Sequence, residues 1–178
     1  MDLREAKEFL NGKGYELIDE GLLGLGFDAK KVKAGYTELL GYLNKVMENY
    51  EKGDSKPIEF NGSMIIAIQN ILKAIEADKI DRAKELHKWF KESDEYYVRI
   101  HGYTKEYAWK LEDDEDSMDK TYNHYKHVFI KEIYPNLQKF GVVSNLKAFD
   151  EDTYTEKDSN KVIGEFGKIK LDFSKLKF

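Results

Sequence analysis

The stretch that follows Asp28 constrains the fold more than any other part of this chain, because its apolar residues repeat at helical spacing over several turns. The residues in this repeat are Val32, Tyr36, Leu39, Leu40, Leu43, Val46, Met47 and Tyr50. The repeat places these side chains along one side of an α-helix. Asp28 is a suitable N-cap, since its carboxylate can accept hydrogen bonds from free backbone N–H groups of the first turn. The pattern therefore predicts a long amphipathic helix that is closed by Gly53 and Pro57.

An αα-hairpin is predicted after Pro57. Its first helix is the segment NGSMIIAIQNILKAIEAD, whose inward residues are Ile65, Ile68, Ile71, Leu72 and Ile75. Asp78 or Asp81 is expected to cap the second helix, which runs to Phe90. The next segment, 95–111, fits two structures. Tyrosines and apolar residues recur at helical spacing, whereas YYVRI has the composition of a strand. We prefer a helix that is interrupted near Gly102.

The C-terminal part is predicted to contain one long helix followed by β structure. The helix begins at Asp116 or Ser117, and Pro135 ends or kinks it. Residues expected on one face of it are Met118, Tyr122, Tyr125, Phe129 and Ile133. The segment AFDEDTYTEKDSN has the composition of a polar loop. KVIGEFGKIKLDF alternates like a strand or hairpin, with Ile169, Leu171 and Phe173 on one side.

These elements predict an α+β fold that is predominantly α-helical: a helical bundle with a short C-terminal strand or hairpin. Residues 1–149 are expected to form the helical domain. Residues 150–178 would form a polar loop and a C-terminal β segment that packs on the same domain. A chain of 178 residues fits one domain of this kind.

The composition excludes several classes of protein. The chain has no cysteine, which rules out disulfides, thiolate nucleophiles and cysteine-ligated zinc or iron–sulfur sites. Its longest apolar run is MIIAI, far shorter than the ~20 residues of a membrane-spanning helix. The charged N-terminal segment MDLREAKEFL differs from a secretory signal. We therefore expect a cytoplasmic protein with no membrane partner.

The net charge of −5 is unevenly distributed along the chain. Residues 92–119 hold ten acidic and three basic residues, a net charge of −7. The remaining 24 acidic and 26 basic residues give +2. Only three of the 29 basic residues are arginines, although arginine is preferred for bidentate contacts to phosphate. This pattern favours a protein partner with a basic surface over direct, sequence-specific binding of a nucleic acid.

Aromatic and acidic residues come together at the centre of this acidic segment. The expected partner-binding residues are Tyr103, Tyr107, Trp109, Glu112, Asp113, Asp114, Glu115 and Asp116. Tyrosine and tryptophan are frequent in the energetic centres of protein interfaces, and fixed carboxylates speed the encounter with a basic partner. The alternative is that some aromatic side chains are core residues and that the acids only favour the start of the next helix through its dipole.

Motifs for chemistry are weak throughout the chain. His124 and His127 share a helical face, but their neighbours on that face are lysines, so we expect no metal there. GLLGLG lacks the Lys-Ser/Thr pair of a phosphate-binding loop. We therefore expect no cofactor and no catalytic residue. A small hydrolase or nuclease stays open as an alternative if dispersed acids and histidines, such as His87 and His101, converge in space.

The opening segment LREAKEFLNGKGYELIDE resembles the start of small accessory proteins of phages and mobile elements, with its EAKEFL helix, glycine stop and GYELI. The resemblance implies a non-enzymatic protein that acts in the cytoplasm of the host cell and inhibits or redirects a host protein. Some members of this group are acidic inhibitors of CRISPR nucleases, which implies an anti-CRISPR-like or other anti-defence role against a basic, nucleic-acid-binding host protein. A third hypothesis is a structural or assembly factor whose charged ends drive formation of a homo-oligomer.

Overall fold

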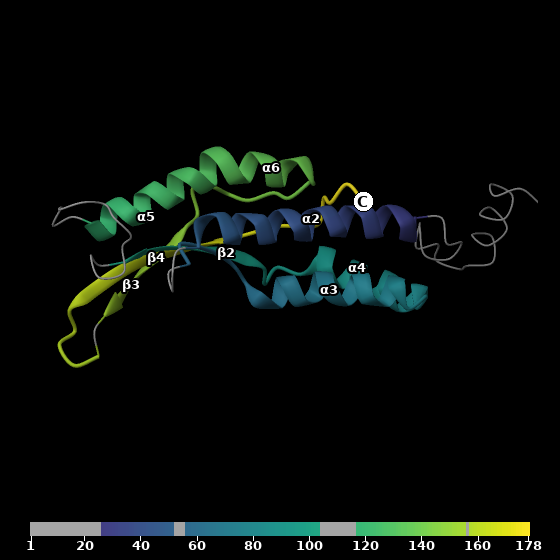
Figure 1. Ribbon diagram of the computed structural model, residues 1–178, viewed down its shortest axis with the longest axis horizontal. Helices are drawn as coiled ribbons and strands as arrows, with labels where there is room; N and C mark the ends of the chain where they lie inside the picture. Colours follow the sequence, from purple (N-terminus) through teal and green to yellow (C-terminus); the bar gives the residue numbers. More distant parts are fainter. Residues whose placement is uncertain (1–25, 52–55, 104–116, 156) are drawn as a thin grey trace, which may run out of the picture.

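The computed structural model describes residues 26–51, 56–103, 117–155 and 157–178. In this part of the chain, a four-stranded antiparallel sheet is packed with α-helices, so the protein has an α+β fold (Figure 1). In chain order, the elements are α2 (Ala29–Tyr50), β1 (Ile58–Phe60), α3 (Gly62–Glu76), α4 (Ile80–Glu92), β2 (Tyr97–Tyr103), α5 (Ser117–Val128), the π-helical η1 (Phe129–Ile133), α6 (Tyr134–Lys139), β3 (Asp150–Thr155) and β4 (Val162–Lys170).

Helix α2 forms as its sequence predicts. The carboxylate of Asp28 accepts hydrogen bonds from the backbone N–H groups of Lys30 and Lys31, each at 3.1 Å, which confirms the expected cap. The buried side of the helix holds Val32, Tyr36, Leu39, Leu43 and Val46. Figure 1 shows α2 between the α3–α4 pair and the continuous helix α5–η1–α6. Its apolar side therefore contributes to a core that is shared by all the helical layers.

The α3–α4 hairpin is confirmed, but neither expected aspartate caps its second helix. Asp78 has a positive φ of 56° and forms the turn between the helices. Its backbone N–H donates to the carbonyl of Ile75. Lys79 is the residue before α4, and no side chain there bonds to the first turn of the helix. The aspartate is used for its tolerance of left-handed backbone geometry rather than for its carboxylate.

Two segments form strands where the sequence indicates other structures. The helix expected for 95–111 is wrong over Tyr97–Tyr103, which is the central strand β2. The loop expected around residue 150 is wrong over Asp150–Thr155, which is the edge strand β3. The strand order is β1-β2-β4-β3 with every neighbouring pair antiparallel. The C-terminal β structure is therefore part of a larger sheet than a single strand or hairpin.

One face of the sheet packs on the helices. Val98 and Ile100 of β2 and Ile169 of β4 point into the core, as do the buried residues of β1. Helix α5 crosses this face, and the Tyr122 side chain lies against Gly167, where a Cβ would overlap its hydroxyl group. Tyr122 also donates a hydrogen bond to Glu151 at 2.9 Å. Ile169, Leu171 and Phe173 are all buried, which confirms that they share one side of the chain.

The long C-terminal helix continues past Pro135, so of the two expected effects of this proline, an end or a kink, the end is wrong. The helix runs through α5, η1 and α6 to Lys139. Proline has no N–H for the usual bond to the carbonyl four residues earlier. The π-helical turn of η1 lies immediately before Pro135 and changes the bonding pattern at that point. Tyr42 of α2 further supports this turn, because its hydroxyl donates to the carbonyl of Ile133 at 3.3 Å.

None of the described helices is long and apolar enough to cross a membrane.

Replacing Gly141 with alanine should lower the free energy of unfolding by about 1–3 kcal/mol. Gly141 has φ +91°, and a Cβ there would overlap the backbone carbonyl oxygen of Lys175. The matched control is Gly41→Ala in the exposed middle of α2, where a Cβ meets no atom within 4 Å. That change should stabilise the protein by about 0.5–1 kcal/mol. Urea unfolding of both variants tests this, and an unchanged free energy of unfolding for Gly141→Ala would contradict the positive φ and the close approach of Lys175.

Candidate binding site on the open face of the sheet

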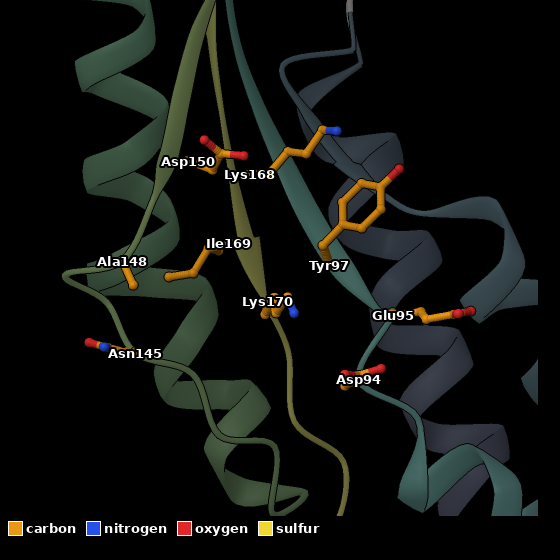
Figure 2. Close-up of a pocket in the computed structure, with 9 residues that line it drawn as sticks. All are labelled: Asp94, Glu95, Tyr97, Asn145, Ala148, Asp150, Lys168, Ile169 and Lys170. Carbon is orange, nitrogen blue, oxygen red and sulfur yellow. The ribbon is translucent and has the colours of Figure 1, made fainter.

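The second face of the sheet carries polar, cationic and aromatic side chains, and we call it the open face. Figure 2 looks onto the part of it that includes Tyr97 and Lys168, with the helices behind the strands. Side chains alternate between the two faces of a strand, and directly paired residues share a face. The open face therefore holds Glu59, Tyr97, Arg99, His101, Asp150, Asp152, Tyr154, Phe166, Lys168 and Lys170.

Four charged residues lie in one line across all four strands, and we call them the charged row. Glu59 is directly opposite Arg99, Arg99 is opposite Lys168, and Lys168 is opposite Asp150. The order of charges from β1 to β3 is thus negative, positive, positive, negative. Neighbouring opposite charges usually stabilise a sheet as ion pairs. Within the described residues, however, no ion pair forms between members of this row.

The cations of the charged row lie over aromatic rings instead. The guanidinium carbon of Arg99 is 5.2 Å from the ring centre of Phe166 and 5.9 Å from that of Tyr97. The ammonium nitrogen of Lys168 is 5.3 Å from the ring centre of Tyr97. Contacts of this kind attract the cation to the face of the ring. They hold Arg99 and Lys168 flat on the sheet and leave the carboxylate of Asp150 without an ion pair among the described residues.

His101 is a structural residue at the edge of this cluster. It is only 3% exposed. Its Nδ1 lies 2.6 Å from the Tyr154 hydroxyl, and its Nε2 lies 3.3 Å from a carboxylate oxygen of Glu59. Burial lowers the pKa of His101 to about 4, helped by repulsion from Arg99 and opposed by Glu59. The ring is therefore neutral at pH 7, with Nε2–H donating to Glu59 and Nδ1 accepting from Tyr154. Both nitrogens are engaged, which argues against a catalytic base.

His87 is also held in a structural role, on the helical side of the molecule. Its Nδ1 lies 2.8 Å from the hydroxyl of Tyr36, and its ring packs against Phe27. Burial, with a smaller contribution from the positive charge of the nearby Lys91, lowers the pKa of His87 to about 4. His124 and His127 are exposed on α5. The described residues contain no group of three His, Asp or Glu side chains that could hold a metal ion.

A concave region lies at one end of the open face, and we call it the groove. It consists of two hollows of about 600 and 610 Å³ that share Asp94, Asn145 and Lys170. Figure 2 shows the first hollow, with β4 in the centre, the Asp94–Glu95 segment on one side and the Asn145–Asp150 segment on the other. The charged residues that line the two hollows are Lys91, Glu92, Asp94, Glu95, Asp150, Lys168, Lys170 and Asp172.

The charges of the groove are ordered across the strands. Asp94 and Glu95 lie on one side, Lys168 and Lys170 lie on the central strand, and Asp150 lies on the other side (Figure 2). None of these five residues takes part in an ion pair within the described part of the chain. With five carboxylates and three lysines, the lining of the two hollows has a net charge of −2. The groove thus offers unpaired charges of both signs, with acids in excess.

The wall formed by residues 143–149 is fixed by hydrogen bonds. The hydroxyl of Tyr134 accepts from the Ser144 N–H at 2.9 Å and lies 3.2 Å from its carbonyl oxygen. The Ser144 hydroxyl donates to the carbonyl of Lys170 at 2.6 Å. Val143 and Asp172 exchange two backbone hydrogen bonds, at 3.0 and 2.8 Å. This wall is therefore attached both to α6 and to the strand end that forms the floor of the groove.

Most of the residues that the sequence indicates as partner-binding lie outside the described residues. These are Tyr107, Trp109 and the acids Glu112, Asp113, Asp114, Glu115 and Asp116. Tyr103 is the last residue of β2, the strand that carries Tyr97 and Arg99. Glu92, Asp94 and Glu95, the first acids of the same acidic segment, line the groove. Sequence reasoning missed Arg99, Lys168 and Asp150, because their proximity depends on strand pairing.

The free energy of unfolding should fall as the pH is lowered from about 6.5 to about 4. His87 and His101 are neutral in the folded protein down to a pKa of about 4, whereas histidines of an unfolded chain bind protons near pH 6.5. The unfolded state therefore binds more protons in this interval and is favoured. Urea unfolding at pH 7 and pH 5 measures the effect. His87→Gln and His101→Gln should each reduce the difference between the two pH values, and an unchanged difference in both would contradict these assignments.

Comparison with known proteins adds no information on function, because no protein-family model, no curated protein and no solved structure matches this chain. The resemblance of the N-terminal segment to phage and mobile-element proteins stays a prediction.

Proposed function

We propose that this protein is a non-enzymatic binding protein that holds an extended segment of a protein partner on the open face of its sheet. The groove carries the proposal, because it places unpaired acids and lysines side by side on a concave, fixed surface. Removing such a surface from water is costly unless the partner replaces the lost water contacts with complementary charges, so the surface selects a partner with matching charges. A polypeptide can supply both signs of charge within a few residues.

The arrangement of charges disfavours other classes of ligand. A nucleic acid would bring its phosphates against Asp94, Glu95 and Asp150, which are not neutralised by ion pairs within the described residues. The charges are also spread along both sides of the groove rather than directed at one point, so an extended ligand satisfies more of them than a small molecule. Within the described residues, the histidines lend no support to the hydrolase alternative, since His87 and His101 are engaged in structural hydrogen bonds.

The excess of acids supports a segment with a net positive charge. The lining has a net charge of −2, and part of it comes from the acidic segment 92–119. This fits a partner with a basic surface, which favours rapid encounter through long-range attraction. We extend the proposal to an inhibitory role against a basic, nucleic-acid-binding host protein, as the resemblance to phage accessory proteins implies.

A library of random 12-residue peptides displayed on a surface tests the proposal, with the full chain as bait. Enriched peptides should be net basic and should bind more weakly at higher salt. Reversing the charge of two side chains of the groove, with Glu95→Lys and Asp150→Lys, should weaken binding of the enriched peptides about tenfold, because repulsion replaces attraction at two positions. Fluorescence anisotropy of the labelled peptides gives the dissociation constants.

The matched control reverses the charge at two exposed glutamates of α2, with Glu38→Lys and Glu48→Lys. It changes the net charge by the same amount and should leave binding nearly unchanged. Thermal unfolding of both double variants verifies that each remains folded. Failure to enrich any peptide over an unrelated bait, or equal binding by the two double variants, would overturn the proposal.

A further inference from the structure

We infer that the bound segment has the pattern basic–x–acidic–x–basic and crosses the strands along the charged row. This inference rests on the proposed function and adds the order of charges in the ligand. The row presents Glu59, Arg99, Lys168 and Asp150 in register. A complementary segment must therefore place basic side chains at its two ends and an acidic side chain between them.

The dimensions of an extended chain match the row. Neighbouring strands lie about 4.8 Å apart, so the four residues span about 14 Å. An extended polypeptide rises about 3.4 Å per residue, and alternate side chains point to the same side. Residues i and i+4 are thus also about 14 Å apart and would lie over Glu59 and Asp150. Residue i+2 then lies midway, between Arg99 and Lys168, where one carboxylate can contact both cations.

The four residues of the charged row form no ion pairs with one another within the described part of the chain, and their side chains are positioned to contact a ligand. Arg99 and Lys168 lie on the rings of Tyr97 and Phe166, which restricts their rotamers before any partner arrives. Glu59 contacts the neutral His101 and retains 48% side-chain exposure. Its charge is therefore not cancelled by that contact and remains available to a basic residue. Restricting the cations in advance reduces the entropy that a partner must remove on binding.

The same order of charges recurs in the groove. Asp94 and Glu95 on one side, Lys170 in the centre and Asp150 on the other side again run from acidic to basic to acidic (Figure 2). Acids thus lie on both sides of the central lysine of the groove, as they do in the charged row, with which the groove shares Asp150. A ligand of uniform negative charge, such as a nucleic acid, would be attracted by the central cations and repelled by the acids on either side.

A second copy of the chain fits the row poorly. Stacking two open faces about a two-fold axis through the centre of the row would reverse its direction. The order negative, positive, positive, negative is unchanged by reversal, so each charge would meet its own sign. Like charges held face to face are strongly disfavoured. The geometry thus points to a different polypeptide rather than to a symmetric dimer through this row.

Two peptides of identical composition test the inference: Gly-Ser-Lys-Ser-Glu-Ser-Lys-Ser-Gly, with the acid in the centre, and Gly-Ser-Glu-Ser-Lys-Ser-Lys-Ser-Gly, with the acid at one end. Titration of the isotope-labelled full chain, followed by NMR chemical shifts, gives both affinity and location. The first peptide should bind at least fivefold more tightly and shift the amide signals of Arg99 and Lys168. Their equal net charge removes non-specific attraction as an explanation.

Reversing the charge of one residue of the charged row provides a second test. Lys168→Glu should abolish the preference for the acid-centred peptide over its isomer, because the central residue would then lie between Arg99 and a carboxylate. The control is Lys131→Glu on the exposed side of η1, which should retain the original preference. Thermal unfolding of both variants verifies that each remains folded, so loss of structure cannot imitate the expected result.

The outcomes separate this inference from the proposed function. Equal binding of the two isomeric peptides on the open face would overturn the order of charges and leave the binding function standing. The same holds if neither isomer binds while peptides from the display library bind to this face. If no peptide from either source binds, or if a single-stranded oligonucleotide binds there more tightly than any peptide, both proposals are overturned.

Discussion

The pairing of β2 with β4 is the interaction on which the rest of the structure depends. These two central strands are paired over their full common length, from Tyr97 opposite Lys170 to Tyr103 opposite Gly164. Because side chains alternate, the pairing places Val98 and Ile169 together in the core and Arg99 and Lys168 together on the open face. A shift by one residue would exchange the two sets. The same register thus fixes the hydrophobic core and the charge order of the candidate site.

The helical part of the fold could be predicted because its signal is local. The apolar residues that follow Asp28 repeat every three or four positions, and the same pattern identifies α3 and α4. The strand β2 could not be identified by spacing alone, because Tyr96, Ile100 and Tyr103 in and beside it also fall at helical spacing. The strand β3 has no apolar alternation at all, because it is an edge strand that is exposed along nearly its whole length.

The candidate site could not be derived from local patterns. Arg99 and Lys168 are far apart in the sequence and become neighbours only through the register of β2 and β4. Asp150 joins them through a third strand whose sequence reads as a polar loop. What the sequence does contain is the excess of acids in residues 92–119, and the first three of these acids line the groove. An excess of acids could thus be predicted from the sequence, whereas the residues of the open face that lie beside these acids could not.

The exposed edge strand β3 also bears on how the protein avoids self-assembly into aggregates. An unpaired strand edge presents free N–H and C=O groups that can recruit a strand from another molecule, and charged side chains are a common protection. Asp150, Glu151 and Asp152 supply three consecutive carboxylates at this edge. Hydrogen bonds from Lys126 and Tyr122 lower the pKa of Glu151, so this residue keeps its charge further into the acidic range. The carboxylate that connects β3 to α5 therefore also helps to protect this strand edge against amyloid-like stacking.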